Sequence, residues 1–200
     1  LTAFAAYAAE KVADSAEAAT PLQKGATIPD VTLKTVDDEA VHLREVVAEK
    51  PAALIFYRGG WCPYCNKHLK EVQNIEDEIR EKGYQIIAIS PDDPDHLRKT
   101  LDQQELSYRL LSDSKLEAAK GFGLAFRLDG DTLERYKGFG INLSESSGGG
   151  NADSLPVPAF YLVDTEGKIT FAHTDPDYKK RLSNDDLSLI HISEPTRLRR

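Results

Sequence analysis

The most constraining feature of this sequence is a Cys-x-x-Cys motif that stands where a buried strand gives way to a helix. Residues 52–57 are nearly all apolar, which is typical of a central strand covered on both faces. A Gly-Gly pair follows, where a sharp turn costs little. From residue 63 to residue 82, apolar residues recur at helical spacing. Cys62 and Cys65 are therefore expected to open a helix directly after a buried strand.

Other segments continue this alternation along the chain. We expect further strands at residues 28–33, 41–43, 84–90, 108–111, 159–163 and 168–172, and further helices at residues 95–104 and 115–122. The order strand, helix, strand, helix indicates parallel pairing and an α/β fold. The turn Asp164-Thr165-Glu166-Gly167 predicts an antiparallel hairpin between the last two strands. Residues 142–155 are expected to form a mobile loop, and residues 177–189 a last amphipathic segment.

Composition limits the partners that such a chain can have. Its 25 basic and 33 acidic residues give a formal charge of −8, which argues against a nucleic-acid groove and against attraction to an anionic membrane. No apolar run approaches the ~20 residues that a membrane helix requires. A small molecule or a protein thiol is the partner that these properties favour.

We divide the chain into three parts. Residues 1–20 are rich in Ala with interspersed charges and predict an N-terminal helical extension, residues 21–189 form one domain, and residues 190–200 are an unpatterned tail that resembles a translated sequencing-adapter peptide. Because the chain starts at Leu1 and contains no methionine, we expect a processed or truncated N-terminus. Both cysteines lie in one motif, so no structural disulfide framework is expected, which suits a reducing compartment such as the cytoplasm.

The position of the motif suits thiol chemistry. Only the thiolate is a useful nucleophile, and the unpaired N–H groups and dipole of a helix N-terminus favour negative charge on Cys62. Cys65 lies about one turn further on the same face, where it can attack a mixed disulfide on Cys62. We expect Cys62 to be the more exposed thiol, with Pro63 in the first helical turn, Trp61 as an apolar wall and Arg58 as an added positive charge.

Two alternatives to redox chemistry stay open for this motif. A Cys-x-x-Cys is also half of a zinc site, and His68 on the same helix face would be a third ligand. Alternatively, both cysteines are inert and buried. We expect neither a metal nor a cofactor, because the sequence has no second cysteine pair and its histidines are few and scattered.

Four segments carry a likeness to a known family. They are Phe56-Tyr57-Arg58-Gly59-Gly60-Trp61-Cys62-Pro63-Tyr64-Cys65, Leu110-Leu111-Ser112-Asp113, Gly121-Phe122-Gly123-Leu124 and Val157-Pro158-Ala159-Phe160-Tyr161-Leu162-Val163-Asp164. Together they resemble the peroxiredoxin-like branch of the alkyl hydroperoxide reductase/thiol-specific antioxidant family, over about residues 23–187. The resemblance implies an α/β thioredoxin-like fold with a central mixed sheet flanked by helices. It also implies an antioxidant role at the expense of a thiol donor.

The motif departs from the family pattern at two of its three residues. Peroxiredoxins carry Pro-x-x-x-Thr-x-x-Cys after the aromatic pair, and here Arg58 stands at the proline position and Cys62 at the threonine position. Cys65 aligns with the cysteine that attacks peroxide. Thioredoxins bury a carboxylate near their second cysteine, and Phe56 takes its place here.

The later strand departs as well. Peroxiredoxins have an arginine just before this strand, and Pro158 stands at that position here. Pro158 instead matches the cis-proline that lies beside the cysteine pair in thioredoxins. We therefore expect a cis bond between Val157 and Pro158. Arg127 is our candidate to replace the missing arginine in space.

The sequence thus predicts a thiol-dependent oxidoreductase. Cys62 or Cys65 attacks a peroxide or a disulfide, the other cysteine resolves the intermediate, and a thioredoxin-like or low-molecular-weight thiol reduces the pair. Exposure favours Cys62 as the nucleophile towards disulfides, whereas the alignment favours Cys65 towards peroxides. The alternative function is a non-enzymatic redox sensor or binding module that a disulfide between Cys62 and Cys65 controls.

Overall fold

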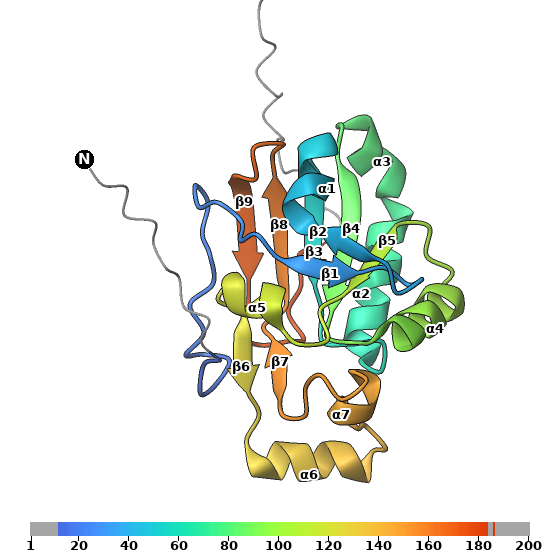
Figure 1. Ribbon diagram of the computed structural model, residues 1–200, viewed down its shortest axis with the longest axis vertical. Coiled ribbons are helices and arrows are strands. Elements are labelled where there is room, and N and C mark those ends of the chain that lie inside the picture. Colours follow the sequence, from blue (N-terminus) through green and yellow to red (C-terminus); the bar gives the residue numbers. More distant parts are fainter. Residues whose placement is uncertain (1–11, 184–185, 187–200) are drawn as a thin grey trace, which may run out of the picture.

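The centre of the molecule is a seven-stranded mixed sheet in the order β2-β1-β5-β4-β3-β8-β9 (Figure 1). The computed structural model describes residues 12–183 and residue 186. The strands of this sheet are β1 (Thr32–Lys34), β2 (Ala40–His42), β3 (Ala52–Phe56), β4 (Gln85–Ser90), β5 (Arg109–Ser112), β8 (Ala159–Val163) and β9 (Ile169–Thr174). Strands β3, β4 and β5 are parallel, and β8 pairs antiparallel with both β3 and β9. The parallel pairing and the hairpin expected from the sequence are confirmed.

Strand β3 shows why both faces of the sheet are covered. All its residues are buried, and its side chains alternate between two apolar clusters, with Leu54 and Phe56 in one and Ala53 and Ile55 in the other. The first cluster includes residues of α1 (Leu43–Glu49) and α5 (Glu117–Gly121), and the second residues of α2 (Pro63–Asn74), α3 (Glu76–Glu81) and α4 (Pro94–Gln104). This α/β arrangement is the thioredoxin-like fold that the sequence predicts.

The helix expected over residues 63–82 is divided into α2 and α3. Ile75 caps both helices with φ −114° and ψ 14°, outside the helical range. Its N–H donates to the carbonyl of Val72 at 3.1 Å, so the last turn of α2 is tightened. Ile75 is thereby buried in the same cluster as Val72 and Ile79.

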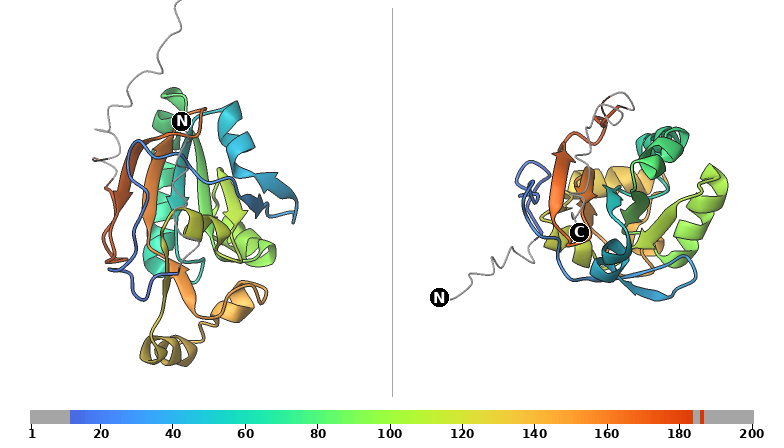
Figure 2. Two further views of the ribbon diagram at one scale, coloured as in Figure 1. Left: turned by 60° about the vertical axis from the view of Figure 1, so that its left-hand side comes forward. Right: turned by 90° about the horizontal axis from the view of Figure 1, so that it is seen from above.

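A second, two-stranded sheet extends one end of the molecule. It pairs β6 (Ala125–Arg127) with β7 (Ser154–Pro156), and α6 (Gly130–Gly138) and α7 (Leu143–Ser146) lie beyond it (Figures 1 and 2). The expected loop over residues 142–155 therefore contains α7 and β7. Asn142 caps α7 by accepting hydrogen bonds from the N–H groups of Ser144 and Glu145.

The segment 12–20 is not the helix that we expected from its alanines. Ala13 instead pairs with β6: its N–H donates to the carbonyl of Ala125, and its carbonyl accepts from the N–H of Arg127, both at 2.8 Å. Val12, Ala16 and Ala19 pack against the first apolar cluster. The alanines are small residues that fit closely beside the domain, and this packing overrides their helix propensity. Residues 1–11 and the tail 190–200 lie outside the described residues.

Within residues 12–183, no helix combines the length and the apolar character that crossing a membrane requires.

Candidate active site

The connection from β3 to α2 brings both cysteines to one end of the central sheet. Cys62 is the N-cap of α2 and Pro63 its first residue, as the sequence predicts, and Cys65 lies on the buried face of the helix. The preceding turn is held by Asp92, which follows β4. The Asp92 carboxylate accepts hydrogen bonds from the N–H of Gly60 at 2.7 Å and from the hydroxyl of Ser90 at 3.1 Å.

Both sulfurs are covered by other side chains. Cys62 and Cys65 are free thiols, each with 1% of its surface exposed, and both belong to the apolar cluster beneath α2. The expectation that Cys62 is the more exposed thiol is therefore wrong. Part of the cover comes from residues about 115 positions further along the chain, and a local motif contains no information on such a contact.

The two thiols hold their protons differently. The pKa of Cys62 is lowered, and the main cause is a hydrogen bond with the Cys65 thiol. The backbone N–H of Cys65 and the positive charges of Arg58 and Arg181 lower this pKa further, whereas burial raises it. Burial raises the pKa of Cys65, and its hydrogen bond with Cys62 raises that pKa further. In the reduced pair, the negative charge is therefore favoured on Cys62 and the proton on Cys65.

Arg58 is a buried cation that has no carboxylate partner among the described residues. It is 3% exposed, its guanidinium donates to the Tyr136 hydroxyl, and its Nε atom has no hydrogen-bond partner within the described residues. The guanidinium carbon lies 5.3, 5.5 and 4.0 Å from the ring centres of Trp61, Tyr136 and Tyr178. Aromatic faces attract a cation in this geometry. Arg58 is thus held by rings and keeps its charge available to Cys62.

A segment that follows β9 lies over the cysteine pair, and we call residues 175–183 the cover segment. Arg181 Nη2 donates to Cys65 Sγ at 3.7 Å. Tyr178 contacts the ring of Tyr64 edge-on, with the ring centres 5.6 Å apart. Leu182 belongs to the same apolar cluster as both cysteines. The expected amphipathic segment 177–189 forms no helix over residues 177–183, and the rest of it apart from Asp186 lies outside the described residues.

Two expectations at the neighbouring strand are corrected. The bond between Val157 and Pro158 is trans, as are all peptide bonds among the described residues. The chain runs directly from β7 into β8, and the Val157 N–H donates to the carbonyl of Leu124 at 2.8 Å, so this stretch is extended. Arg127 is exposed and pairs with Asp153, with Nε and Oδ2 3.2 Å apart. Arg127 therefore does not replace the missing family arginine, whereas Arg181 reaches a sulfur.

A small cavity lies where Phe56 replaces the carboxylate of thioredoxins. Its volume is about 10 Å³, and Phe56, Pro158, His68, His173 and Arg181 are among its lining residues. The Nε2 atoms of both histidines have no hydrogen-bond partner in this part of the chain. Burial lowers the pKa of His68 to about 4, so its imidazole is neutral near pH 7. Residues 12–183 contain no cluster of three or more His, Cys, Asp or Glu side chains placed to bind a metal ion.

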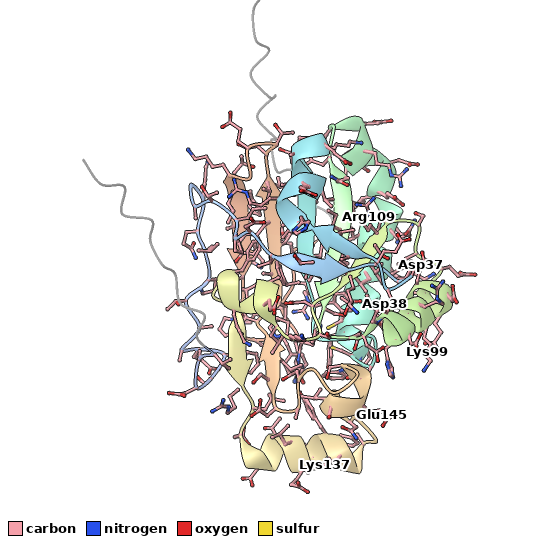
Figure 3. All side chains as sticks on the ribbon, in the orientation of Figure 1. Asp37, Asp38, Lys99, Arg109, Lys137 and Glu145 are labelled. Atoms are coloured by element: carbon pink, nitrogen blue, oxygen red, sulfur yellow. The ribbon has the colours of Figure 1, made fainter. Side chains whose placement is uncertain are left out.

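Two larger pockets lie on either side of the cysteine motif. One of about 260 Å³ is bounded by Trp61 and by residues of α4 and α7, among them Lys99 and Glu145, which are labelled in Figure 3. The other, of about 300 Å³, is lined by Arg58, Pro158 and Tyr178 among others. Neither sulfur lines either pocket. A reactant therefore reaches the sulfurs only after side chains have moved.

Sequence reasoning missed three residues of this site. Tyr136, Tyr178 and Arg181 were not among the residues that the sequence predicts for it. The contacts of Tyr178 and Arg181 are between segments far apart in the sequence, so the only available signal was an aromatic residue followed three positions later by a cation.

These features define a thioredoxin-fold thiol protein whose cysteine pair begins the helix after a central strand. The family model described as the AhpC/TSA family matches residues 24–172. The chain belongs to this family, which confirms the resemblance found in the sequence.

Individual relatives agree with this assignment. Peroxiredoxin bcp1 of Schizosaccharomyces pombe is 30% identical over 102 residues, which cover 51% of this chain and 52% of that protein. Thiol-disulfide oxidoreductase ResA of Halalkalibacterium halodurans is 24% identical over 143 residues, covering 71% of this chain and 63% of that protein. The structure of reduced Prx3 from Vibrio vulnificus in complex with H2O2 matches with a TM-score of 0.66 at 19% identity, over 84% of this chain and 97% of that one. The chain spans about half to two thirds of the length of these curated relatives.

Proposed function

We propose that this protein is a thiol peroxidase and thiol-disulfide oxidoreductase that acts through Cys62 and Cys65. The observation that carries the proposal is the position of two free cysteines at the N-cap and in the first turn of α2. The pKa of Cys62 is lowered there and that of Cys65 is raised. A thiolate is the attacking species, and a neighbouring thiol within reach resolves the intermediate. Membership of the AhpC/TSA family supports this chemistry.

The proposed cycle starts with the Cys62 thiolate. Its sulfur attacks a peroxide oxygen, an S–O bond forms, the O–O bond breaks, and the alkoxide or hydroxide leaves with the electron pair and takes up a proton. Cys65 then loses its proton and attacks the sulfur of the Cys62 sulfenic acid, so that an S–S bond forms and hydroxide leaves. A thioredoxin-like or low-molecular-weight thiol returns the two electrons. With a disulfide substrate, a mixed disulfide on Cys62 replaces the sulfenic acid.

The surrounding residues have supporting roles in this proposal. Arg58 stabilises the Cys62 thiolate, and Pro63 fixes the start of α2. Trp61 and Tyr64 form the walls of the approach through their contacts with Tyr136 and Tyr178. Pro158 closes the base of the site, because it lines pockets on both sides of the cover segment. We propose a reducing compartment such as the cytoplasm, because the cycle consumes a thiol donor.

A steady-state assay tests the proposal. Wild type, Cys62→Ser and Cys65→Ser are compared with hydrogen peroxide, cumene hydroperoxide and insulin disulfide as substrates, with dithiothreitol as donor. Loss of all turnover in Cys62→Ser, with sulfenic acid accumulating in Cys65→Ser, is expected. Equal activity of the two variants and wild type would refute the scheme, and thermal unfolding of each variant controls for misfolding.

A further inference from the structure

In the second step of the proposed cycle, Cys65 must lose its proton. Its surroundings favour the protonated thiol, because they raise its pKa. The ionisable or charged groups that act on this thiol are Cys62 at the helix start, Tyr57 after β3, and Arg181, and His68 on the same helix interacts with Arg181. His173 on β9 lies behind His68. No carboxylate is among the main causes that shift the pKa of Cys65, and the Phe56 side chain at the thioredoxin carboxylate position belongs to the apolar cluster on the other face of the sheet.

Arg181 is the one permanently charged side chain in contact with Cys65 in this part of the chain. Its Nη2 atom lies 3.7 Å from Cys65 Sγ, within the range for a hydrogen bond to sulfur. In the reduced pair its charge is shared, because Cys62 carries the negative charge. Oxidation of Cys62 to sulfenic acid removes that charge. Cys65 is then the only sulfur on which the guanidinium can stabilise an anion.

The cover segment that carries Arg181 is attached to the site by few contacts. Its other side-chain hydrogen bonds remain within residues 175–186, for example those of Asp175 with the Asp177 N–H and of Ser183 with Asp186. Tyr178 and Leu182 add ring and apolar contacts. The bond from Arg181 to Cys65 is therefore the single side-chain hydrogen bond that joins the described part of this segment to the cysteine pair.

We propose that Arg181 is a catalytic residue of the resolving step, where its guanidinium stabilises the Cys65 thiolate that attacks oxidised Cys62. In this step the S–S bond forms between the two cysteines, the S–O bond of Cys62 breaks, and the departing hydroxide becomes water by taking up a proton equivalent to the one that Cys65 released. The inference rests on the proposed function. It assigns the cation of this step to a segment outside the Cys-x-x-Cys motif.

The first test measures Cys65 alone and needs no peroxide activity. In Cys62→Ser protein, the rate of reaction of Cys65 with iodoacetamide is followed from pH 5 to pH 11. Adding Arg181→Ala is expected to move the midpoint upwards by about one to three pH units, because an opposite charge at this distance favours the ionised form. Arg181→Lys should restore part of the shift, since it keeps the charge without the planar fork.

Two matched variants make this test specific. Lys179→Ala removes an exposed cation from the same segment and is expected to leave the midpoint unchanged. His68→Gln removes the competing titratable neighbour. The proposal is overturned if Arg181→Ala leaves the midpoint unchanged, or if Lys179→Ala moves it as far as Arg181→Ala does. Because the midpoint is read separately from the plateau rate, a more open site alone does not imitate the effect.

The second test follows the complete pair in a single turnover. After a pulse of hydrogen peroxide, Arg181→Ala is expected to form the disulfide at least about tenfold more slowly than wild type, with dimedone-reactive sulfenic acid accumulating on Cys62. Disulfide formation at the wild-type rate and with the wild-type pH profile refutes the inference while leaving the proposed function intact. A wild type that forms neither sulfenic acid nor disulfide after the pulse refutes the peroxidase function, and the alkylation midpoints then decide separately whether Arg181 acts on Cys65.

Discussion

The guanidinium carbon of Arg58 lies 4.0 Å from the centre of the Tyr178 ring, although Arg58 lies in the turn after β3 and Tyr178 lies beyond β9. This contact joins the cover segment to the floor of the site. Since Arg58 is buried and has no ion pair with a described carboxylate, the Tyr178 ring helps to stabilise its charge.

Removal of the Tyr178 ring is expected to loosen the cover segment. A cation–π contact contributes roughly 0.5–2 kcal/mol, so Tyr178→Ala should raise the rate at which iodoacetamide modifies the cysteines about twofold to thirtyfold at a fixed pH. Tyr178→Phe keeps the ring and is the matched control, with a rate close to wild type. If Tyr178→Ala protein reacts no faster than wild type, the ring does not hold the cover segment in place.

The ionisation of Cys62 gives a second prediction. The hydrogen bond with Cys65 is the main cause that brings the pKa of Cys62 to about 6, so its rate of alkylation should rise through about pH 6 and reach a plateau above pH 7. Cys65→Ala removes this hydrogen bond and is expected to move the midpoint towards the ordinary value of about 8.5. Cys65→Ser keeps a donor and should move it less. Identical midpoints for wild type and Cys65→Ala would show that Cys65 does not stabilise the thiolate.

The parts of the fold that could be predicted from sequence depend on local patterns. The apolar run before the motif and the helical spacing after it were enough to place β3, α2 and the two cysteines. Likewise, a Gly turn between two apolar runs was enough to predict the hairpin of β8 and β9. Helix α6 was missed because none of its residues is fully buried and only Leu133 and Tyr136 pack against an apolar cluster, so its apolar face is narrow.

The parts that could not be predicted depend on distant contacts. Helix propensity suggested a helix over residues 12–20, but pairing of Ala13 with β6 decides its conformation. The burial of both sulfurs depends on Arg181 and Leu182, whose approach to α2 no periodicity encodes. Helix-terminus chemistry therefore placed both cysteines at the start of α2 but could not give their exposure.

The turn before the motif supplies a third prediction. A Cβ atom at Gly60 would overlap Thr100 Oγ1 on α4 and lie 3.1 Å from Thr100 Cβ. Gly60→Ala must therefore shift either the turn that Asp92 holds or the Thr100 side chain, and is expected to lower the free energy of unfolding by about 1–3 kcal/mol and to reduce turnover. Gly130→Ala is the control, because a Cβ there meets nothing within 4 Å. The double variant with Thr100→Ala should recover part of the loss, and no recovery would point to a different cause.

The buried His68 makes the fold sensitive to acid, with a sign that can be worked out. Burial lowers the pKa of His68 from 6.5 to about 4, so between these values the unfolded chain binds a proton that the folded chain does not. The free energy of unfolding should therefore fall as the pH drops through this window, by up to about 3 kcal/mol from this group. Asp92 opposes the trend, because burial raises its pKa to about 6 and the folded chain then holds the extra proton.

Comparison with a variant separates the contribution of His68 from that of Asp92. Urea unfolding of wild type and His68→Gln is measured at several pH values from 7 to 4. The free energy of unfolding of wild type minus that of the variant should decrease towards pH 4, because only wild type carries the proton-linked penalty. His42→Gln, at an exposed position on β2, is the matched control. Parallel curves for wild type and His68→Gln would mean that His68 takes up its proton equally in the folded and unfolded chain, and that its imidazole is not held neutral beside Cys65.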